Sequence, residues 1–298
     1  MALSTMAPIL SLLLAAAAAY AYLNTDGAAS APRRLIAPHH KSGFVFSYQL
    51  VEQLRRAGAS DVEFLGDWPG NLRLFRRKVT SGTRTPHKTS MIVNIVRDPF
   101  DMVVSGTLYH RGGAECTSAC CERNDWAAPT PHRGIAHLAH HHAQYGLPAP
   151  AKHDRWYCSY LKRLNTSQAL LAEMVRAHAS DINEMAGAFE TTRQHPRSMT
   201  SVCLERFEAG PQSFNRTMAH VLATLKLSHR PELLLLGAGG RTSTSTTKYK
   251  GPHSVTRGLS PAAKLVLSRT ARRLDAKHFG GAFGRLARAV RCHGSIRG

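Results

Sequence analysis

The alternation of apolar and polar positions predicts strands and helices in turn from residue 33 onward. Short apolar runs predict buried strands, and the β-branched run Met91–Val96 is the strongest of them. Longer stretches with apolar residues at helical spacing predict the helices between them. The predicted strands are Arg34–Pro38, Asp61–Leu65, Met91–Val96 and Met199–Glu205. The predicted helices are Phe46–Arg56, Phe100–His110, Ile135–Tyr145, Trp156–Asn165, Gln168–Phe189, Phe214–Leu225, Ala262–Lys277 and Phe283–Arg291.

This order of elements predicts an α/β fold, a three-layer arrangement in which helices flank a parallel sheet. We expect one domain over residues 33–298, with an irregular insertion around 111–197 that begins in a segment rich in Gly, Pro, Cys and His. Ligands in such folds bind at the carboxyl ends of the strands. Two turns, Pro38–Gly43 and Arg97–Pro99, stand at such ends.

Residues 1–32 are predicted to be a signal-anchor and a short linker. Residues 7–23 carry no charge, and seventeen residues is the short limit for a membrane span. The basic residues Arg33 and Arg34 follow this run and none precedes it, which fits an uncleaved anchor poorly. Ala19–Ala21 offers a small-x-small cleavage site, so a cleaved signal peptide is the alternative. Both interpretations place the rest of the chain in a lumen.

Sequons and cysteines agree with a lumenal location. Asn165 and Asn215 begin glycosylation sequons, and the chain has six cysteines, an even number. Cys120 and Cys121 are adjacent, so we expect each to bond with Cys158, Cys203 or Cys292. The paired C-x-x-C spacing typical of zinc sites is missing. His137, His140 and His141 share a helix face that is more typical of a polar surface than of a metal site, so no metal is predicted.

The chain is strongly basic, with 39 Lys and Arg against 19 Asp and Glu and a net charge of +20. Such a balance attracts anions: nucleic acid, phosphorylated or sulfated small molecules, acidic polysaccharides or a membrane surface. A basic solvated surface is the other interpretation. The C-terminal arginines present the same choice between a grip on a polyanion and a solvated face: Arg269, Arg272, Arg273, Arg285, Arg288, Arg291 and Arg297.

The first turn has the composition of an anion-binding loop. Lys41, Ser42 and Gly43 open a predicted helix, where backbone N–H groups hold anions and the lysine adds a positive charge. No glycine precedes Lys41 at the spacing of the nucleotide-triphosphatase motif. An ordinary basic turn is the alternative for this segment alone.

The second turn carries a complementary set of groups. Arg97 follows a predicted strand, and Ser105 lies two helical turns farther along. An arginine can bind a phosphate through two N–H groups while a hydroxyl donates to the same group. Asp98 and Asp101 are placed to cap the start of the helix. Two anion loops on one sheet suit a ligand with two separated phosphates.

Together these residues resemble the sulfotransferases that use 3′-phosphoadenosine 5′-phosphosulfate (PAPS). Pro38–Phe44 resembles their P-x-K-[ST]-G-T loop, and Ile95–Gly106 resembles their 3′-phosphate motif. Lys250–His253 resembles the K-G-R-x-H loop of Golgi glycan sulfotransferases, and Val202–Glu205 resembles the strand ending in glutamate before it. Phe44 and Val45 stand where threonine is usual after the glycine. Pro252 stands where arginine is usual.

The resemblance implies a P-loop, nucleotide-kinase-like sulfotransferase fold and an enzyme that transfers the sulfuryl group of PAPS to a hydroxyl or amine. The co-substrate is then PAPS, with no metal, and Lys41 stabilises the leaving phosphate. Glu63 is the candidate general base, with His40, His110 and Glu115 as alternatives. The implied cofactor-binding residues are His40, Lys41, Ser42, Gly43, Phe44, Val45, Arg97, Ser105, Lys250 and Gly251.

The implied partners are an acceptor glycan, lipid or small alcohol, and the membrane through the N-terminal segment, but no specific nucleic acid. The implied location is a single-pass Golgi membrane protein with a lumenal catalytic domain. Secretion or retention in the ER lumen after signal cleavage is the alternative. Two other functions stay open: a kinase-type P-loop enzyme, and a non-catalytic protein that keeps the sulfotransferase fold and binds acidic glycans or nucleotides.

Overall fold

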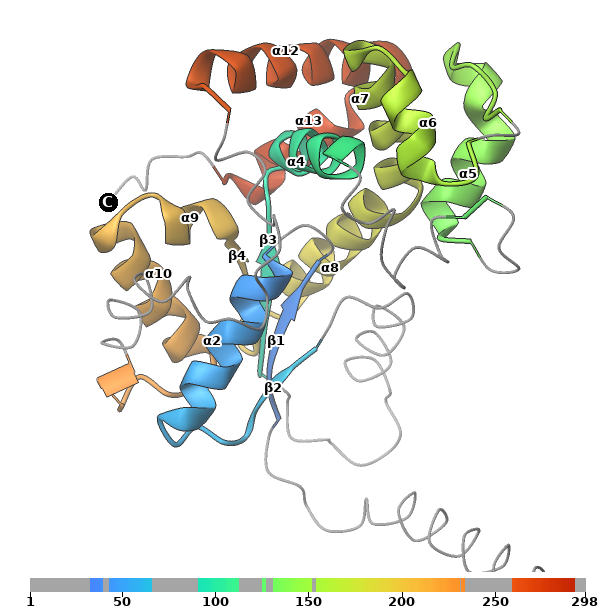
Figure 1. The fold of residues 1–298 in the computed structure, drawn as a ribbon. Coiled ribbons are helices and arrows are strands. Elements are labelled where there is room, and N and C mark those ends of the chain that lie inside the picture. The colour runs from blue at the N-terminus through green and yellow to red at the C-terminus, as the bar shows by residue number, and fades with distance from the viewer. Residues whose placement is uncertain are drawn as a thin grey trace, which may run out of the picture.

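The computed structural model describes residues 33–39, 43–65, 91–112, 125–126, 131–151, 154–230, 232–233 and 259–292 (Figure 1). Within these residues the predicted parallel sheet is confirmed. Its strands are β1 (Arg34–Pro38), β2 (Val62–Phe64), β3 (Met91–Val96) and β4 (Met199–Cys203). They pair in the order β2-β1-β3-β4, and every pairing is parallel.

The strand order places a change of direction in the middle of the sheet. The chain runs from β1 outward to β2 and then returns to the other side of β1 as β3. Pro38 is opposite Ile95, so β1 and β3 reach the same edge together. Open α/β sheets bind ligands outside the carboxyl ends of strands at such a switch point. The two turns singled out from the sequence leave the sheet at this point.

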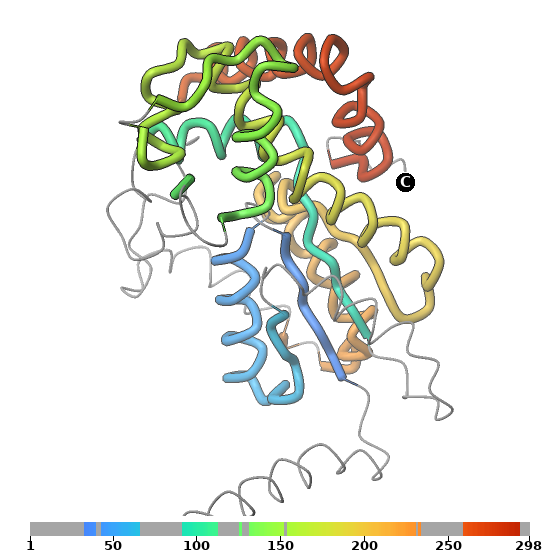
Figure 2. The backbone as a smooth tube through the Cα atoms, turned by 90° about the vertical axis from the view of Figure 1, so that its right-hand side faces the viewer, coloured from blue at the N-terminus to red at the C-terminus, as the bar shows by residue number. Residues whose placement is uncertain are grey.

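The described helices lie on both faces of the sheet and beyond its carboxyl edge. Figure 2 shows the sheet in the lower half of the molecule, with α4 to α7, α12 and α13 gathered above it. The α-helices are α2 (Phe44–Arg56), α4 (Pro99–Gly112), α5 (Arg133–His141), α6 (Tyr157–Arg163), α7 (Thr166–Ala177), α8 (Asn183–Gln194), α9 (Leu204–Glu208), α10 (Pro211–Thr224), α12 (Pro261–His278) and α13 (Ala282–Val290). Two shorter segments are a 3-10 helix, η4 (His142–Tyr145), and a π-helix, η5 (His178–Ile182).

Alternation along β3 divides the core between the two faces of the sheet. Val93 and Ile95 are fully buried in one cluster with apolar side chains of α2 and α10. Ile92 points to the other face, where α8 covers β3 and β4. Successive side chains of a strand point to opposite faces, so an all-apolar strand requires cover on both. The three-layer α/β architecture expected from the sequence is therefore present.

A second core lies above the carboxyl edge. Val96 and Phe100 join apolar residues of α7, α12 and α13 in one buried cluster. Helix α4 stands at its centre and buries most of its residues, including the polar Asp101, Ser105, Thr107 and His110. The start of α12 follows its sequence signal, because Ser260 accepts a hydrogen bond from the backbone N–H of Ala263 and Pro261 occupies the first turn.

Several predicted elements end elsewhere, and two of them differ most. The strand predicted to reach Glu205 stops at Cys203, and Leu204 begins α9, so Glu205 lies in a helical turn. The long helix predicted to reach Phe189 is divided by the π-helix η5. A period of 3.6 residues does not distinguish one continuous helix from two helices with a wider turn between them, because the apolar stripe continues through the change.

The predicted cysteine pairing is wrong in part. Cys203 and Cys292 bond to each other, with Cα atoms 5.3 Å apart. Of the three partners expected for Cys120 and Cys121, only Cys158 is left, and it too is disulfide-bonded. The reason is tertiary: α13 brings the C-terminal part of the chain back to the end of β4. The described residues include no helix long and apolar enough to span a membrane, and residues 7–23 lie outside them.

Candidate active site at the carboxyl edge of the sheet

Three connections meet at the switch point of the sheet: β1 to α2, β3 to α4, and β4 to α9. Gly43 precedes α2 with φ of 87°, a left-handed conformation that favours glycine. A Cβ atom on Gly43 would lie only 2.7 Å from Cδ1 of Leu204, the first residue of α9. The backbone conformation favours glycine here, and the missing Cβ leaves room for the side chain of Leu204 on the β4–α9 connection.

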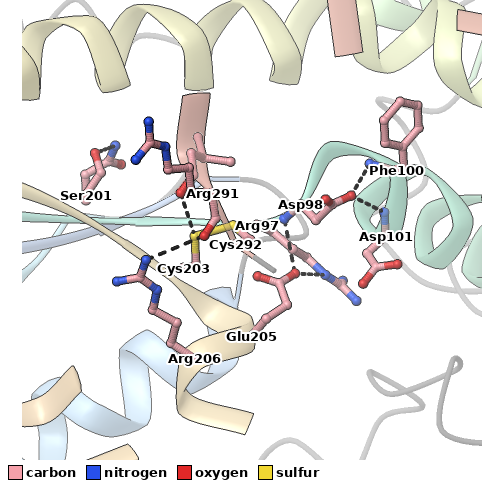
Figure 3. Close-up of a disulfide and its surroundings, with 12 residues drawn as sticks. Arg97, Asp98, Phe100, Asp101, Ser201, Cys203, Glu205, Arg206, Arg291 and Cys292 are labelled. Carbon is pink, nitrogen blue, oxygen red and sulfur yellow. Dashed lines mark hydrogen bonds and ion pairs between the residues drawn. A yellow bond between two sulfur atoms is a disulfide. The ribbon is translucent and has the colours of Figure 1, made fainter. Parts of the chain in front are cut away.

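Arg97 and Glu205 face each other across this junction, as Figure 3 shows. The Nε atom of Arg97 lies 3.6 Å from Oε1 of Glu205, and each side chain is 14% exposed. The same oxygen accepts a hydrogen bond from the backbone N–H of Asp98, at 3.1 Å. Glu205 thus holds both the guanidinium and the turn that carries it, and is the residue that positions Arg97.

The environment of Glu205 is poor in water. Desolvation raises the pKa of its carboxyl above the usual value, against the lowering effect of hydrogen bonds from backbone N–H groups and of Arg97. Its Oε2 atom is buried and has no hydrogen-bond partner among the described residues. A buried oxygen without a partner is costly, so a hydrogen bond from a ligand or a water, or a bound proton, would stabilise Oε2 of Glu205.

The start of α4 is capped as the sequence predicts. Oδ1 of Asp98 accepts hydrogen bonds from the backbone N–H groups of Phe100, at 2.8 Å, and Asp101, at 3.2 Å. Asp101 lies in the first turn, and its carboxylate also binds Nζ of Lys264 on α12, at 3.0 Å. Ser105 follows one turn later on the same face of the helix and is buried. The helix rise places Ser105 about 9 Å beyond Pro99.

His39, a residue that the sequence reasoning did not single out, begins a polar chain across the sheet. Its Nε2 atom lies 2.8 Å from Oδ1 of Asn94, whose Nδ2 donates to Oγ of Ser201 at 3.0 Å. Ser201 donates in turn to Thr192 of α8, at 3.2 Å. Desolvation lowers the pKa of His39 to about 4, although the bond to Asn94 opposes this shift. A neutral ring therefore stands where β1 ends, and its position after the strand is the one sequence signal that could have pointed to it.

The structure describes part of the predicted loop. Phe44 packs its ring edge-on against Phe64 of β2, with centroids 4.9 Å apart, and Val45 is partly buried beside it in the first turn. The aromatic side chain at the position where threonine is usual therefore stabilises the contact between α2 and β2. The other predicted cofactor residues lie outside the described residues: His40, Lys41, Ser42, Lys250 and Gly251.

Glu63 does not lie near Arg97, although its neighbour Phe64 contacts Phe44. It is opposite Leu35, which is itself opposite Ile92, five residues before Arg97. Along a strand this separation is about 16 Å. The Glu63 carboxylate lies 3.8 Å from Nε of Arg33, and both side chains are exposed. The sequence predicted the strand, but only the register shows that Glu63 lies toward the amino edge of the sheet, away from the switch point.

The remaining candidates behave as structural groups. His110 is buried, and its Nδ1 atom lies 2.9 Å from Oε2 of Glu173. The rings of His137 and His141 lie 4.3 Å apart on α5. Among the described residues, the one group of three possible metal ligands is Cys203, Glu205 and Cys292, whose two sulfur atoms are already bonded to each other.

The comparisons with known proteins add no relative. No family model, no curated protein and no solved structure matches this chain. The function must therefore be argued from the geometry of the switch point and from the residues around it.

Proposed function

We propose that this protein is a lumenal sulfotransferase that moves the sulfuryl group of PAPS to an acceptor hydroxyl or amine, most naturally of a glycan. The observation that carries the proposal is the strand order β2-β1-β3-β4, because its switch point brings together the two loops whose sequences resemble the PAPS motifs. A ligand with two separated phosphates can span these two loops. The residue types and the resemblance predicted the loops, and the sheet supports their proximity.

Each loop has a distinct role in the proposal. The β1–α2 turn, with Lys41 and the N–H groups at the start of α2, binds the 5′-phosphosulfate. Arg97 and Ser105 bind the 3′-phosphate, and Glu205 keeps the guanidinium of Arg97 at the sheet edge. The close packing of Gly43 on Leu204 keeps the first loop against the third connection.

The reaction is an in-line displacement at sulfur. The acceptor oxygen or nitrogen forms the new bond to sulfur, the bond from sulfur to the 5′-phosphate oxygen breaks, and the acceptor proton passes to a general base. The products are the sulfated acceptor and 3′,5′-ADP. By analogy with phosphoryl transfer, charge builds on the leaving phosphate, where Lys41 stabilises it.

The proposal does not assign the general base to a single residue. The Glu63 carboxylate lies beside Arg33 near the opposite edge, and His110 is enclosed with Glu173. Neither position favours contact with an acceptor at the switch point. His40 and Glu115 are the two alternatives that lie outside the described residues.

Lys41→Ala tests the proposal directly. We expect a near-normal melting temperature, a modest loss of 3′,5′-ADP affinity and a fall in sulfate transfer of about 10²–10³, the range for loss of one donor to transition-state charge. The measurements are thermal unfolding, calorimetric titration with 3′,5′-ADP, and transfer of labelled sulfate from PAPS to a panel of glycans, lipids and small alcohols. Lys162→Ala, at an exposed position of α6, is the matched control.

Three results separate the alternatives. Transfer by Lys41→Ala at the wild-type rate removes the reacting sulfate from this loop and contradicts the proposal. Saturable 3′,5′-ADP binding by the wild type, without transfer to any acceptor, favours the non-catalytic binding protein. The packing of Phe44 on Phe64, which replaces a hydroxyl near the sulfate, is the observation that keeps this second function open. Turnover of ATP without PAPS favours the kinase-type enzyme.

A further inference from the structure

A basic cleft lies between α12 and α13, beside the start of α4. Its volume is about 340 Å³, and it is lined by Phe100, Arg272, Asp275, Arg285 and Arg288 together with glycines of the α12–α13 turn. This volume is at the lower end of pockets that hold small ligands. We call this site the α12–α13 cleft.

The carboxylate in the cleft is already engaged with backbone groups. Asp275 is buried, and its two oxygens accept hydrogen bonds from the backbone N–H groups of Phe283, at 3.1 Å, and Gly284, at 2.8 Å. These groups belong to the first turn of α13, where a negative charge is stabilised by the helix dipole. The negative charge of Asp275 therefore balances the helix start.

The three arginines of the cleft are exposed, and none forms an ion pair with a carboxylate among the described residues. The guanidinium of Arg272 lies over the ring of Phe100, 4.3 Å from its centroid. Arg285 donates to the backbone carbonyl of Gly280 at the turn. Over residues 259–292 the chain has eight Lys or Arg and a single acidic residue, Asp275. Even with Lys264 bound to Asp101, this surface carries more positive charge than its own carboxylate balances.

We propose that the α12–α13 cleft binds the sulfate or carboxylate groups of an acidic saccharide. Guanidinium groups recognise such oxyanions through pairs of parallel N–H bonds, and three arginines around one small cleft can hold one or two of them. This inference goes beyond sulfuryl transfer, since it concerns binding of a saccharide at a surface that the transfer reaction does not require.

The cleft fits a saccharide better than a nucleic acid. Single-stranded nucleic acids bind where bases stack on accessible aromatic rings along a basic track. Phe100 is 2% exposed and is covered by Arg272, so it offers no ring face to a base. Phe100 also lies three residues after Arg97, so a saccharide in the cleft reaches the neighbourhood of the sheet edge.

Binding of defined oligosaccharides to the full chain tests the inference without PAPS or nucleotide. The probes are a heparin-derived sulfated hexasaccharide, a hyaluronan-derived hexasaccharide that carries carboxylates only, and a single-stranded DNA of equal charge. The test variant is Arg285→Ala/Arg288→Ala. The matched control is Arg269→Ala/Arg273→Ala, which removes the same charge from exposed positions of α12 outside the cleft lining. Titrations at one salt concentration give the affinities.

We expect the cleft variant to lose affinity for at least one oligosaccharide by about tenfold or more, the range for a hydrogen bond to a charged group. The matched control should lose about threefold or less, as for exposed charges. Arg285→Lys/Arg288→Lys keeps the charge but removes the forked donors, and should show an intermediate loss. Because it is the milder change, it also decides the question if the alanine variant does not fold, as judged by its melting temperature.

Four outcomes overturn the inference. They are equal losses for the cleft variant and the matched control, full affinity in both cleft variants, tighter binding of the DNA than of both oligosaccharides, and no saturable oligosaccharide binding by the wild type. The two oligosaccharides identify whether sulfate or carboxylate is the recognised group. Affinity for 3′,5′-ADP, measured on the same variants, stays at the wild-type value, so failure of this inference is distinct from failure of the proposed function.

Discussion

Two charged regions of the molecule differ in how completely their groups are paired. Between α4, α6 and α7, a cluster of ionisable side chains is enclosed in the helical layer above the sheet: His110, Tyr157, Glu173, Arg176 and Asp181. At the sheet edge, Arg97 and Glu205 are partly exposed and Glu205 keeps an oxygen without a partner. We call the first region the buried charge cluster.

The members of the buried charge cluster are paired with one another at short distances. Glu173 accepts from Tyr157 at 2.7 Å and from Arg176 at 2.8 Å, and lies 2.9 Å from His110. Arg176 also binds Asp181, at 2.9 Å. The neighbouring arginine and histidine hold the pKa of Glu173 well below its usual value, against desolvation. Side chains that are buried and paired this tightly join neighbouring helices.

The packing around the cluster is equally strict. A Cβ atom on Gly106 of α4 would clash with Oε1 of Glu173, and one on Gly134 of α5 would clash with the carbonyl oxygen of Arg176. The two glycines let neighbouring helices approach the ion pair closely enough to exclude water. The comparison teaches that burial and complete pairing mark a structural charge. Partial exposure at a switch point, with an incompletely satisfied acceptor, marks a candidate ligand site.

The largest effect on stability should come from Glu173→Gln. Removing one charge from a buried, hydrogen-bonded pair costs about 3–5 kcal/mol of unfolding free energy, because the buried charge of Arg176 then loses one of its two carboxylate partners. Glu190→Gln is the matched control, since Glu190 and Arg193 form the same i,i+3 pair at an exposed position. Its cost should be about 0–1 kcal/mol. Denaturant unfolding measures both, and equal costs would show that the cluster does not carry the structural role argued above.

The ring of His39 should make the sheet edge sensitive to acid. Its pKa is about 4 in the fold against 6.5 for an ordinary histidine, so the unfolded chain binds the proton more readily. The contribution of His39 to the free energy of unfolding is therefore at its maximum above pH 6.5. It decreases as the pH falls toward 4, by at most about 3 kcal/mol.

His39→Gln provides the test of this contribution. Denaturant unfolding from pH 7 to pH 4 should give a flatter dependence of stability on pH for the variant than for the wild type. Burial is the physical cause of the low pKa and the bond to Asn94 opposes it, so Asn94→Ala should lower the pKa of His39 further and steepen the dependence of stability on pH. Parallel curves for the wild type and His39→Gln would mean that His39 does not titrate in this window.

Arg97→Ala should have the smallest of the three effects in free energy, and it should act on binding. The loss of 3′,5′-ADP affinity should be about 1.5–3 kcal/mol, the range for hydrogen bonds to charged groups. 5′-AMP lacks the 3′-phosphate and should lose far less. Calorimetric titration of both ligands measures the difference, with Arg155→Ala at an exposed position as the control. Equal losses for both nucleotides would place Arg97 among the structural charges.

Much of the fold could be predicted because local pattern and burial agree in it. Met91–Val96 was predicted with its observed bounds, since a continuous β-branched run fits a strand covered on both faces. The start of α12 followed from Ser260 and Pro261, whose effects act within one turn. The end of β4 was missed because Leu204 and Glu205 suit either a strand or a helix, and the neighbouring connections decide between them.

The candidate site was predictable only in its loops. Lys41, Arg97 and Ser105 were found because an anion site needs specific residue types at fixed positions after a strand. The role of Glu205 in holding Arg97, the polar chain that begins at His39, and the place of Glu63 near the opposite edge depend on strand register. Register is a relation between segments far apart in the chain, so no local pattern contains it.

The sequence by itself therefore determined the succession of strands and helices, the parallel character of the sheet and the two candidate anion loops, because these follow from side-chain periodicity and residue chemistry within a few turns. Only the tertiary structure decided the strand order, the bond between Cys203 and Cys292, and which charges are enclosed and which are left at the surface. The physical reason is that burial and pairing arise between segments far apart in the chain, such as Asp101 and Lys264, which are 163 residues apart, through packing that no single segment can specify.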